Sequence, residues 1–283
     1  MQFPLLLLSI SAYSFQNVFR KKYSSLVSGG DFAFNAIMSL FATVYFFLSA
    51  GQLSFDLSII PYAILFAACC GVAMVSMLVA LREGSYALTN MILSYSLVIP
   101  TLYGPVFLGE TISYFAVGGI AILLVSLYLV REPKETGERK KTSAVYLIAI
   151  SAAFVSTGMC SVSQKIQQIG QSGLYKNEFM IAAMAMLTVV FALIAAFRER
   201  PAIRSMRLGA LLPSACGLLN GISNHMVLIL TGMMSTAIFF PILSASSLVI
   251  SFVLSLTVYR EKLLRRQIVA ALMSIVAIIL LNI

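Results

Sequence analysis

The sequence predicts an all-α integral membrane protein with ten transmembrane helices, arranged as two inverted five-helix repeats. Three observations support this prediction: the composition, the number and spacing of apolar stretches, and a match between the two halves of the chain. Of the 283 residues, 60% are hydrophobic and 10% are charged, and the mean hydropathy is +0.97. A soluble domain carries roughly 25% charged residues because charge covers its surface. Lipid is therefore the expected solvent.

Ten apolar stretches are long enough to cross the hydrocarbon core, which requires about 20 mainly apolar residues. Short breaks that contain turn or charged residues separate them. The alternating pattern of a membrane β-barrel strand is not visible, so each stretch is predicted to be a helix. The stretches cover approximately residues 3–20, 32–50, 58–81, 86–108, 112–130, 144–166, 178–197, 208–230, 235–259 and 263–282.

The two halves of the chain match. Only residues 131–143 resemble a hydrophilic linker, and they divide the chain into a first repeat, 1–130, and a second repeat, 144–283. Aligning Glu110 with Glu261 superposes LVIPTLYGPVFLGE on LVISFVLSLTVYRE. Each glutamate is predicted to mark the turn between the fourth and fifth helices and to cap the next helix, where the helix dipole favours negative charge. Because five is odd, the second repeat enters the membrane upside down.

Three segments carry a family resemblance: REGSYALTNMILSYSLVIP, the following FLGETISYFAVGGIAILLVSLYLV, and YREKLLRRQIVAALMSIVAIILL. With the 5+5 layout, they resemble the EamA-type members of the drug/metabolite transporter superfamily. The second repeat matches less well, since Tyr-Arg-Glu replaces Leu-Gly-Glu and Ser251 stands where Pro100 would repeat. The first helix also lacks the family's usual tryptophan. The resemblance implies a secondary transporter but names no substrate, because the family handles amino acids, metabolites, cations and drugs.

Positive charge is distributed unevenly between the two sides of the predicted bundle. Only Lys165 and Lys176 fall on one side, out of 19 lysines and arginines. Positive residues stay cytoplasmic, so the linker is predicted to lie inside a cell inner or plasma membrane and both termini outside. The same basic collar explains the net charge of +9 and predicts contact with anionic lipid instead of nucleic acid. The collar lies at residues 20–22, 82, 131–141, 198–207 and 260–266.

Ten polar side chains within the apolar stretches are the predicted substrate-binding residues. An amide that faces lipid is costly, so each must either hydrogen-bond a neighbouring helix or line a wet cavity. Inverted-repeat transporters bind substrate near the midplane between their halves. No acid lies mid-span, so tyrosine faces would hold a cation and the amides a neutral or zwitterionic solute. The predicted residues are Tyr13, Gln16, Asn17, Asn90, Tyr95, Tyr103, Gln164, Asn220, Asn224 and His225.

Some of these side chains are open to two interpretations. His225 is either a satisfied structural histidine or a proton-sensing or substrate-contacting group. Asn220 and Asn224 are expected to share a helix face with Gly217 and Gly221, whose spacing suits close helix packing. Each asparagine then either joins two helices by a hydrogen bond or lines a cavity. Tyr45 is expected on an outer helix, away from the substrate.

The expected function is secondary active transport of a small polar or amphipathic solute by alternating access. The alternative is a membrane channel or a scaffold subunit without concentrative transport. A membrane-embedded enzyme is disfavoured, because one histidine and no mid-span acid leave little for a catalytic site. The four cysteines lack metal-ligand spacing, so neither metal nor cofactor is predicted. The substrate itself, the direction of transport, the oligomeric state and any coupling ion, such as a proton, are left open.

Overall fold

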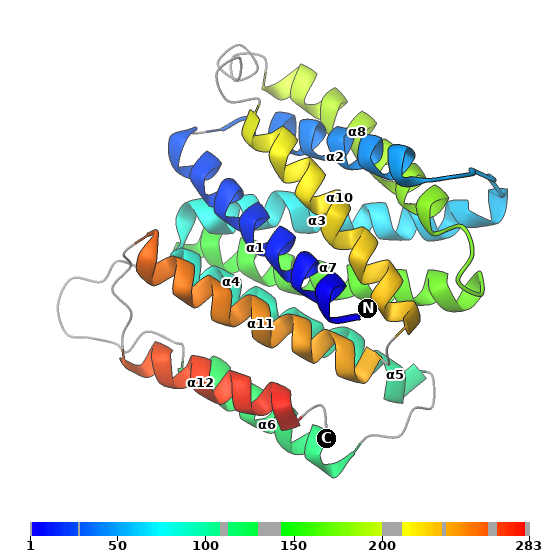
Figure 1. Ribbon diagram of the computed structural model, residues 1–283. Helices are drawn as coiled ribbons and strands as arrows, with labels where there is room; N and C mark the ends of the chain where they lie inside the picture. The colour runs from blue at the N-terminus through cyan, green and yellow to red at the C-terminus, as the bar shows by residue number, and fades with distance from the viewer. Residues whose placement is uncertain are drawn as a thin grey trace.

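The protein, described from a computed structural model, is a bundle of helices that run alongside one another (Figure 1). No strand occurs in the described residues, which are 2–27, 29–107, 113–129, 143–199, 211–233, 236–259 and 265–280. The elements are α1 (Gln2–Leu26), α2 (Asp31–Ser49), η1 (Leu57–Ile59), α3 (Ile60–Glu83), α4 (Tyr86–Ser94), η2 (Tyr95–Leu97), α5 (Val98–Phe107), α6 (Tyr114–Leu129), α7 (Ala144–Gly170), α8 (Lys176–Arg198), α10 (Leu211–Met233), α11 (Thr236–Thr257) and α12 (Arg265–Leu280).

The observed helices follow the predicted stretches, with differences in length and one break. Helix α7, for example, continues to Gly170, beyond the predicted end at residue 166. Helix α1 continues to Leu26, beyond the predicted end at residue 20. The stretch predicted at 86–108 is broken into α4, η2 and α5. The predicted linker and the predicted turn residues Glu110 and Glu261 lie outside the described residues. Because every regular element in the described part of the chain is helical, the all-α prediction is confirmed for that part.

Among the described residues, four segments are long and apolar enough to cross a membrane. These are α2, the run from η1 through α3, α7, and α8. Their outward faces also carry large apolar side chains. Leu48 is 77% exposed, Ile148 71% and Phe197 77%. Soluble monomers rarely expose continuous apolar surface of this kind. Both features are those of a membrane protein.

The helices pack in pairs that join the two halves of the sequence. Helix α2 lies against α8 and α10, helix α1 lies against α10, and helix α3 lies against α7 and α8. At the opposite side of the bundle, α6 packs against α12 (Figure 1). Helix α1 begins and α12 ends at the same end of the bundle.

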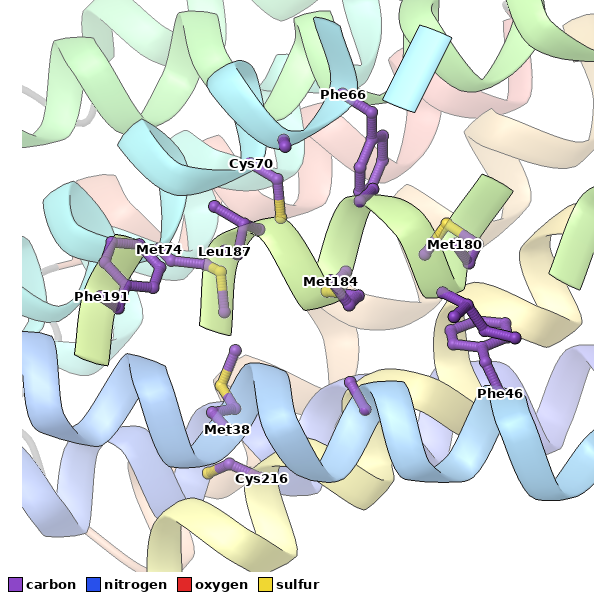
Figure 2. Packing of buried hydrophobic residues seen from close by; sticks show 14 of the residues in the cluster. Met38, Phe46, Phe66, Cys70, Met74, Met180, Met184, Leu187, Phe191 and Cys216 are labelled. Carbon is purple, nitrogen blue, oxygen red and sulfur yellow. The ribbon is translucent and has the colours of Figure 1, made fainter. Parts of the chain in front are cut away.

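A core rich in methionine joins α2, α3, α8 and α10. Figure 2 shows Met38, Met74, Met180 and Met184 between these helices, together with phenylalanine and cysteine side chains. The four methionines are at most 3% exposed. Because methionine is unbranched and flexible, it fills irregular gaps between helices that cross at different angles.

Glycines set the closest approach between α10 and α2. A Cβ added at Gly217 would lie 2.3 Å from the backbone oxygen of Met38, and one added at Gly221 would lie 2.6 Å from a ring carbon of Tyr45. The prediction that these glycines serve packing agrees with this geometry. The two asparagines expected near this face, Asn220 and Asn224, line the cavity described below.

The break between α4 and α5 follows from proline. Pro100 has no N–H to donate to the carbonyl of Ser96, four residues earlier, and its ring crowds that carbonyl. The chain forms the 3₁₀ turn η2 directly upstream. Helix α7 approaches this turn at Gly158, where an added Cβ would lie 2.7 Å from the Ser96 oxygen. The kink therefore also shapes the contact between the two halves.

Charged side chains cap helix ends at one end of the bundle. The Glu199 carboxylate, just after α8, accepts hydrogen bonds from the backbone N–H groups of Phe32 (3.2 Å) and Ala33 (2.9 Å) in the first turn of α2. Asp31 at the start of α2 forms a salt bridge with Arg82 at the end of α3. Negative charge at a helix N-terminus is stabilising, so these acids serve local structure.

Candidate functional site

A cavity of about 150 Å³ lies inside the bundle. Residues of α1, α3, α4 and η2 line it from the first half of the chain, and residues of α7, α10 and α11 line it from the second. This volume accommodates several water molecules or a small solute. Its polar lining side chains are Tyr13, Gln16, Arg20, Ser94 and Ser96 from the first half, and Thr157, Ser161, Gln164, Asn220, Ser223 and Asn224 from the second.

Helix α1 contributes a polar stripe to this cavity. Tyr13, Gln16 and Arg20 are spaced by three and four residues, which places them on one face of a helix. Gln16 is 1% exposed and Arg20 is 5% exposed. The Gln16 side-chain oxygen has no hydrogen-bond partner, and its nitrogen lies 4.0 Å from the Met38 sulfur. The stripe therefore includes a buried amide oxygen that the described residues do not satisfy.

Amides of α7 and α10 form the opposite wall. The Gln164 Nε2 donates to Asn224 Oδ1 at 3.1 Å, and the Asn224 Nδ2 donates to the backbone oxygen of Asn220 at 3.0 Å. The Asn220 Oδ1 is buried and has no partner. These residues both link α7 to α10 and line the cavity, so the two interpretations predicted for Asn224 apply together.

The other two predicted amides lie apart from the cavity lining. The Asn17 Nδ2 donates to Asn90 Oδ1 at 2.8 Å, which joins α1 to α4. Asn90 in turn donates to the backbone oxygen of Tyr86, one helical turn earlier. Asn17 is fully buried and Asn90 is 2% exposed. This pair is a contact between helices.

Two predicted tyrosines also point elsewhere. The Tyr95 hydroxyl lies 2.9 Å from the Ser126 hydroxyl of α6. The Tyr103 ring stacks on Phe107 of its own helix, with ring centroids 5.1 Å apart. Neither residue lines the cavity.

His225 faces helix α2. Its Nδ1 lies 3.3 Å from the Tyr45 hydroxyl, and its ring centroid lies 5.7 Å from that of Phe46. The geometry matches the structural interpretation of the histidine. Tyr45 was expected to stand apart on an outer helix, but it packs directly on α10 and is part of this contact.

Arg20 is the charged cavity residue that the sequence did not reveal, because it was assigned to the basic collar; the lining residues Ser94, Ser96, Thr157, Ser161 and Ser223 were not predicted either. Helix α1 extends past Arg20, whose guanidinium is buried. Its Nη1 lies 2.7 Å from the sulfur of Met77 and its Nη2 lies 3.4 Å from the sulfur of Met38. Its Nε has no partner. The helical spacing from Tyr13 through Gln16 to Arg20 was the signal that could have revealed it.

No protein-family model matches the sequence, and no curated protein matches it. Solved structures do match: one, described only as "Crystal structure of protein", is 13% identical in sequence, with a TM-score of 0.70 over 99% of this chain and 98% of that chain. Similarity at this level of identity shows a shared fold over the whole length and does not assign an activity.

Proposed function

We propose that the protein is a secondary transporter of a small polar solute, of the EamA type within the drug/metabolite transporter superfamily. The observation that carries the proposal is the cavity between the two halves of the chain, which has Gln16, Arg20 and Asn220 among its polar lining side chains. Transporters built from repeats bind their substrate at such an interface.

An inverted repeat of ten helices is part of this proposal, and the helix contacts support it. In such a repeat, the counterparts of α1, α2, α3, α4 with α5, and α6 are α7, α8, α10, α11 and α12, in that order. Two helices that contact each other should then have counterparts that also contact each other. The contact of α1 with α10 then corresponds to that of α7 with α3, and the contact of α2 with α10 to that of α8 with α3. The pairs α2–α8, α4–α11 and α6–α12 each correspond to themselves.

The experiment that tests the function is solute flux in proteoliposomes. Purified protein is first screened with amino acids, organic acids and organic cations for compounds that raise its unfolding temperature. Uptake of the hits is then measured in reconstituted vesicles. A carrier gives saturable uptake that a trans-side solute accelerates. Flux that stays linear over a wide concentration range indicates a channel, and no flux of any stabilising compound indicates a scaffold.

The structure divides the predicted site residues into those that line the cavity and those that do not, and substitutions can test this division. Asn224→Ala is expected to weaken binding of a transported solute by about 2- to 10-fold, the equivalent of one neutral hydrogen bond. Tyr95→Phe is expected to leave affinity unchanged, because that hydroxyl faces Ser126. Solute-dependent thermal stabilisation measures both variants. Equal weakening by the two substitutions would place the substrate outside this cavity.

The proposed orientation places the 131–143 linker in the cytoplasm and both termini outside. Arg20 is buried in the bundle, so it no longer counts as a charge of the basic collar. The difference in positive charge between the two sides of the membrane is still large without it. In a variant with the native cysteines replaced, a cysteine at Thr136 is expected to resist a membrane-impermeant maleimide in intact cells, and a C-terminal tag is expected to be accessible. The reverse labelling pattern would contradict the orientation.

A further inference from the structure

The Arg20 guanidinium is a buried positive charge that lacks a strong acceptor. Its side chain faces the cavity, its closest contacts are two methionine sulfurs, and its Nε is unpartnered. A thioether sulfur is only a weak hydrogen-bond acceptor, and arginine does not lose its proton in proteins. Burying a charge without a counter-charge is unfavourable. The site therefore favours binding of a group that supplies negative charge.

The aspartates and glutamates in the described part of the chain do not line the cavity that Arg20 faces. Asp31 pairs with Arg82, and Asp56 accepts a hydrogen bond from the Ser58 N–H. Glu178 accepts from the Ser54 N–H, Glu199 caps α2, and Glu83 is exposed at the end of α3. Among the described residues, no aspartate or glutamate lines the cavity.

From these observations we infer that the cavity binds a small organic monocarboxylate, held by Arg20. A carboxylate accepts two parallel hydrogen bonds from the planar guanidinium fork, and such charge-assisted bidentate pairs are among the strongest hydrogen bonds in proteins. The inference rests on the proposed transport function, since it names the substrate class of the same cavity. It differs from the sequence-based expectation that tyrosine faces hold a cation or that the amides hold a neutral or zwitterionic solute, because it places the contact to the solute at Arg20.

The rest of the cavity suits a single negative charge. Among the described residues that line it, Arg20 is the only lysine or arginine, so only half of the charge of a doubly charged phosphate would be neutralised. A cation would meet the guanidinium as a like charge. The side chains of Gln16 and Asn220 also line the cavity, which suits a carboxylate that also carries a hydroxyl or another hydrogen-bonding group.

The test compares acids with their own amides. Lactate and lactamide, and benzoate and benzamide, are nearly equal in shape and differ in charge. Binding is measured in detergent as the rise in unfolding temperature, followed by circular dichroism because the chain contains no tryptophan. We expect at least one acid to stabilise the protein in a concentration-dependent manner and its amide to have little effect. Inorganic phosphate and the lipid phosphatidylglycerol are tested in parallel.

Variants then assign the effect to Arg20. Arg20→Gln is expected to weaken acid binding at least about tenfold, because a charge-assisted contact is lost, and Arg20→Lys to weaken it less. Lys22→Gln is the matched control, since it removes one positive charge from the exposed side of the same helix and should bind acid like the native protein. If Arg20→Gln does not fold, Arg20→Lys alone still tests the loss of the guanidinium fork.

The outcomes for substrate class and for transport are separate. Equal stabilisation by acid and amide, unchanged acid binding in both Arg20 variants, or a response to phosphate or phosphatidylglycerol alone would overturn the inference. Arg20-dependent acid binding without flux in proteoliposomes would uphold the inference and contradict the transport function. Saturable transport of a solute that does not depend on Arg20 would uphold the transport function and contradict the inference about the substrate class.

Discussion

Gly217→Val is expected to lower the free energy of unfolding by about 3 kcal/mol, at the upper end of the usual cost of overpacking. The added Cβ would lie 2.3 Å from the Met38 backbone oxygen and 2.7 Å from the Phe41 Cβ. A backbone carbonyl cannot rotate away as a flexible side chain can, so α10 and α2 must separate. Their separation would also disturb the methionine core between α2, α3, α8 and α10 (Figure 2). Unfolding in mixed micelles, followed by circular dichroism, measures the effect.

Gly118→Val provides the matched control. It makes the same substitution within helix α6, where an added Cβ would meet no atom within 4 Å among the neighbours of Gly118. The two variants share the same change in helix propensity, so their difference reports packing alone. Equal destabilisation by both would show that the close approach of α10 to α2 does not limit stability.

The second large effect is expected at the amide pair between α1 and α4. Asn17→Ala removes the donor that satisfies Asn90 Oδ1 at 2.8 Å, in a site where both residues are almost fully buried. Leaving a buried acceptor unpaired costs about 1–3 kcal/mol, and hydrogen bonds between membrane helices fall toward the lower part of that range. We therefore expect a loss of about 1–2 kcal/mol in the free energy of unfolding.

A double-mutant cycle isolates the pair. Once Asn17→Ala is present, Asn90→Ala should cost less than it does alone, because the hydrogen bond is already absent. The control combines Asn17→Ala with Thr188→Ala, whose hydroxyl donates to the backbone oxygen of Met184 within α8, and it should be additive. Additivity in the Asn17 and Asn90 cycle would mean that this hydrogen bond contributes nothing measurable.

The sequence alone determined the helical class of this protein and the approximate place of each helix. The length of an apolar stretch and the charge at its ends are local properties, so they can be counted without knowledge of the partner helix. The kink was partly visible for the same reason, because Pro100 removes a backbone hydrogen bond wherever its helix lies. The exact end of α1 was not visible, since a helix can continue past the basic residues that mark the end of an apolar stretch.

Only the tertiary structure decided which polar residues meet. The sequence identified Asn17 and Asn224 as equally good cavity residues, yet Asn17 pairs with Asn90 and Asn224 faces the cavity. Helical periodicity tells which residues share a face, but it does not tell what lies opposite that face. The same limit concealed Arg20, whose charge resembled a collar residue until the packing of α1 against α3, α10 and α11 placed it inside the bundle. Burial is a property of the whole arrangement of helices, and it is burial that changes this arginine from a surface charge into a candidate binding group.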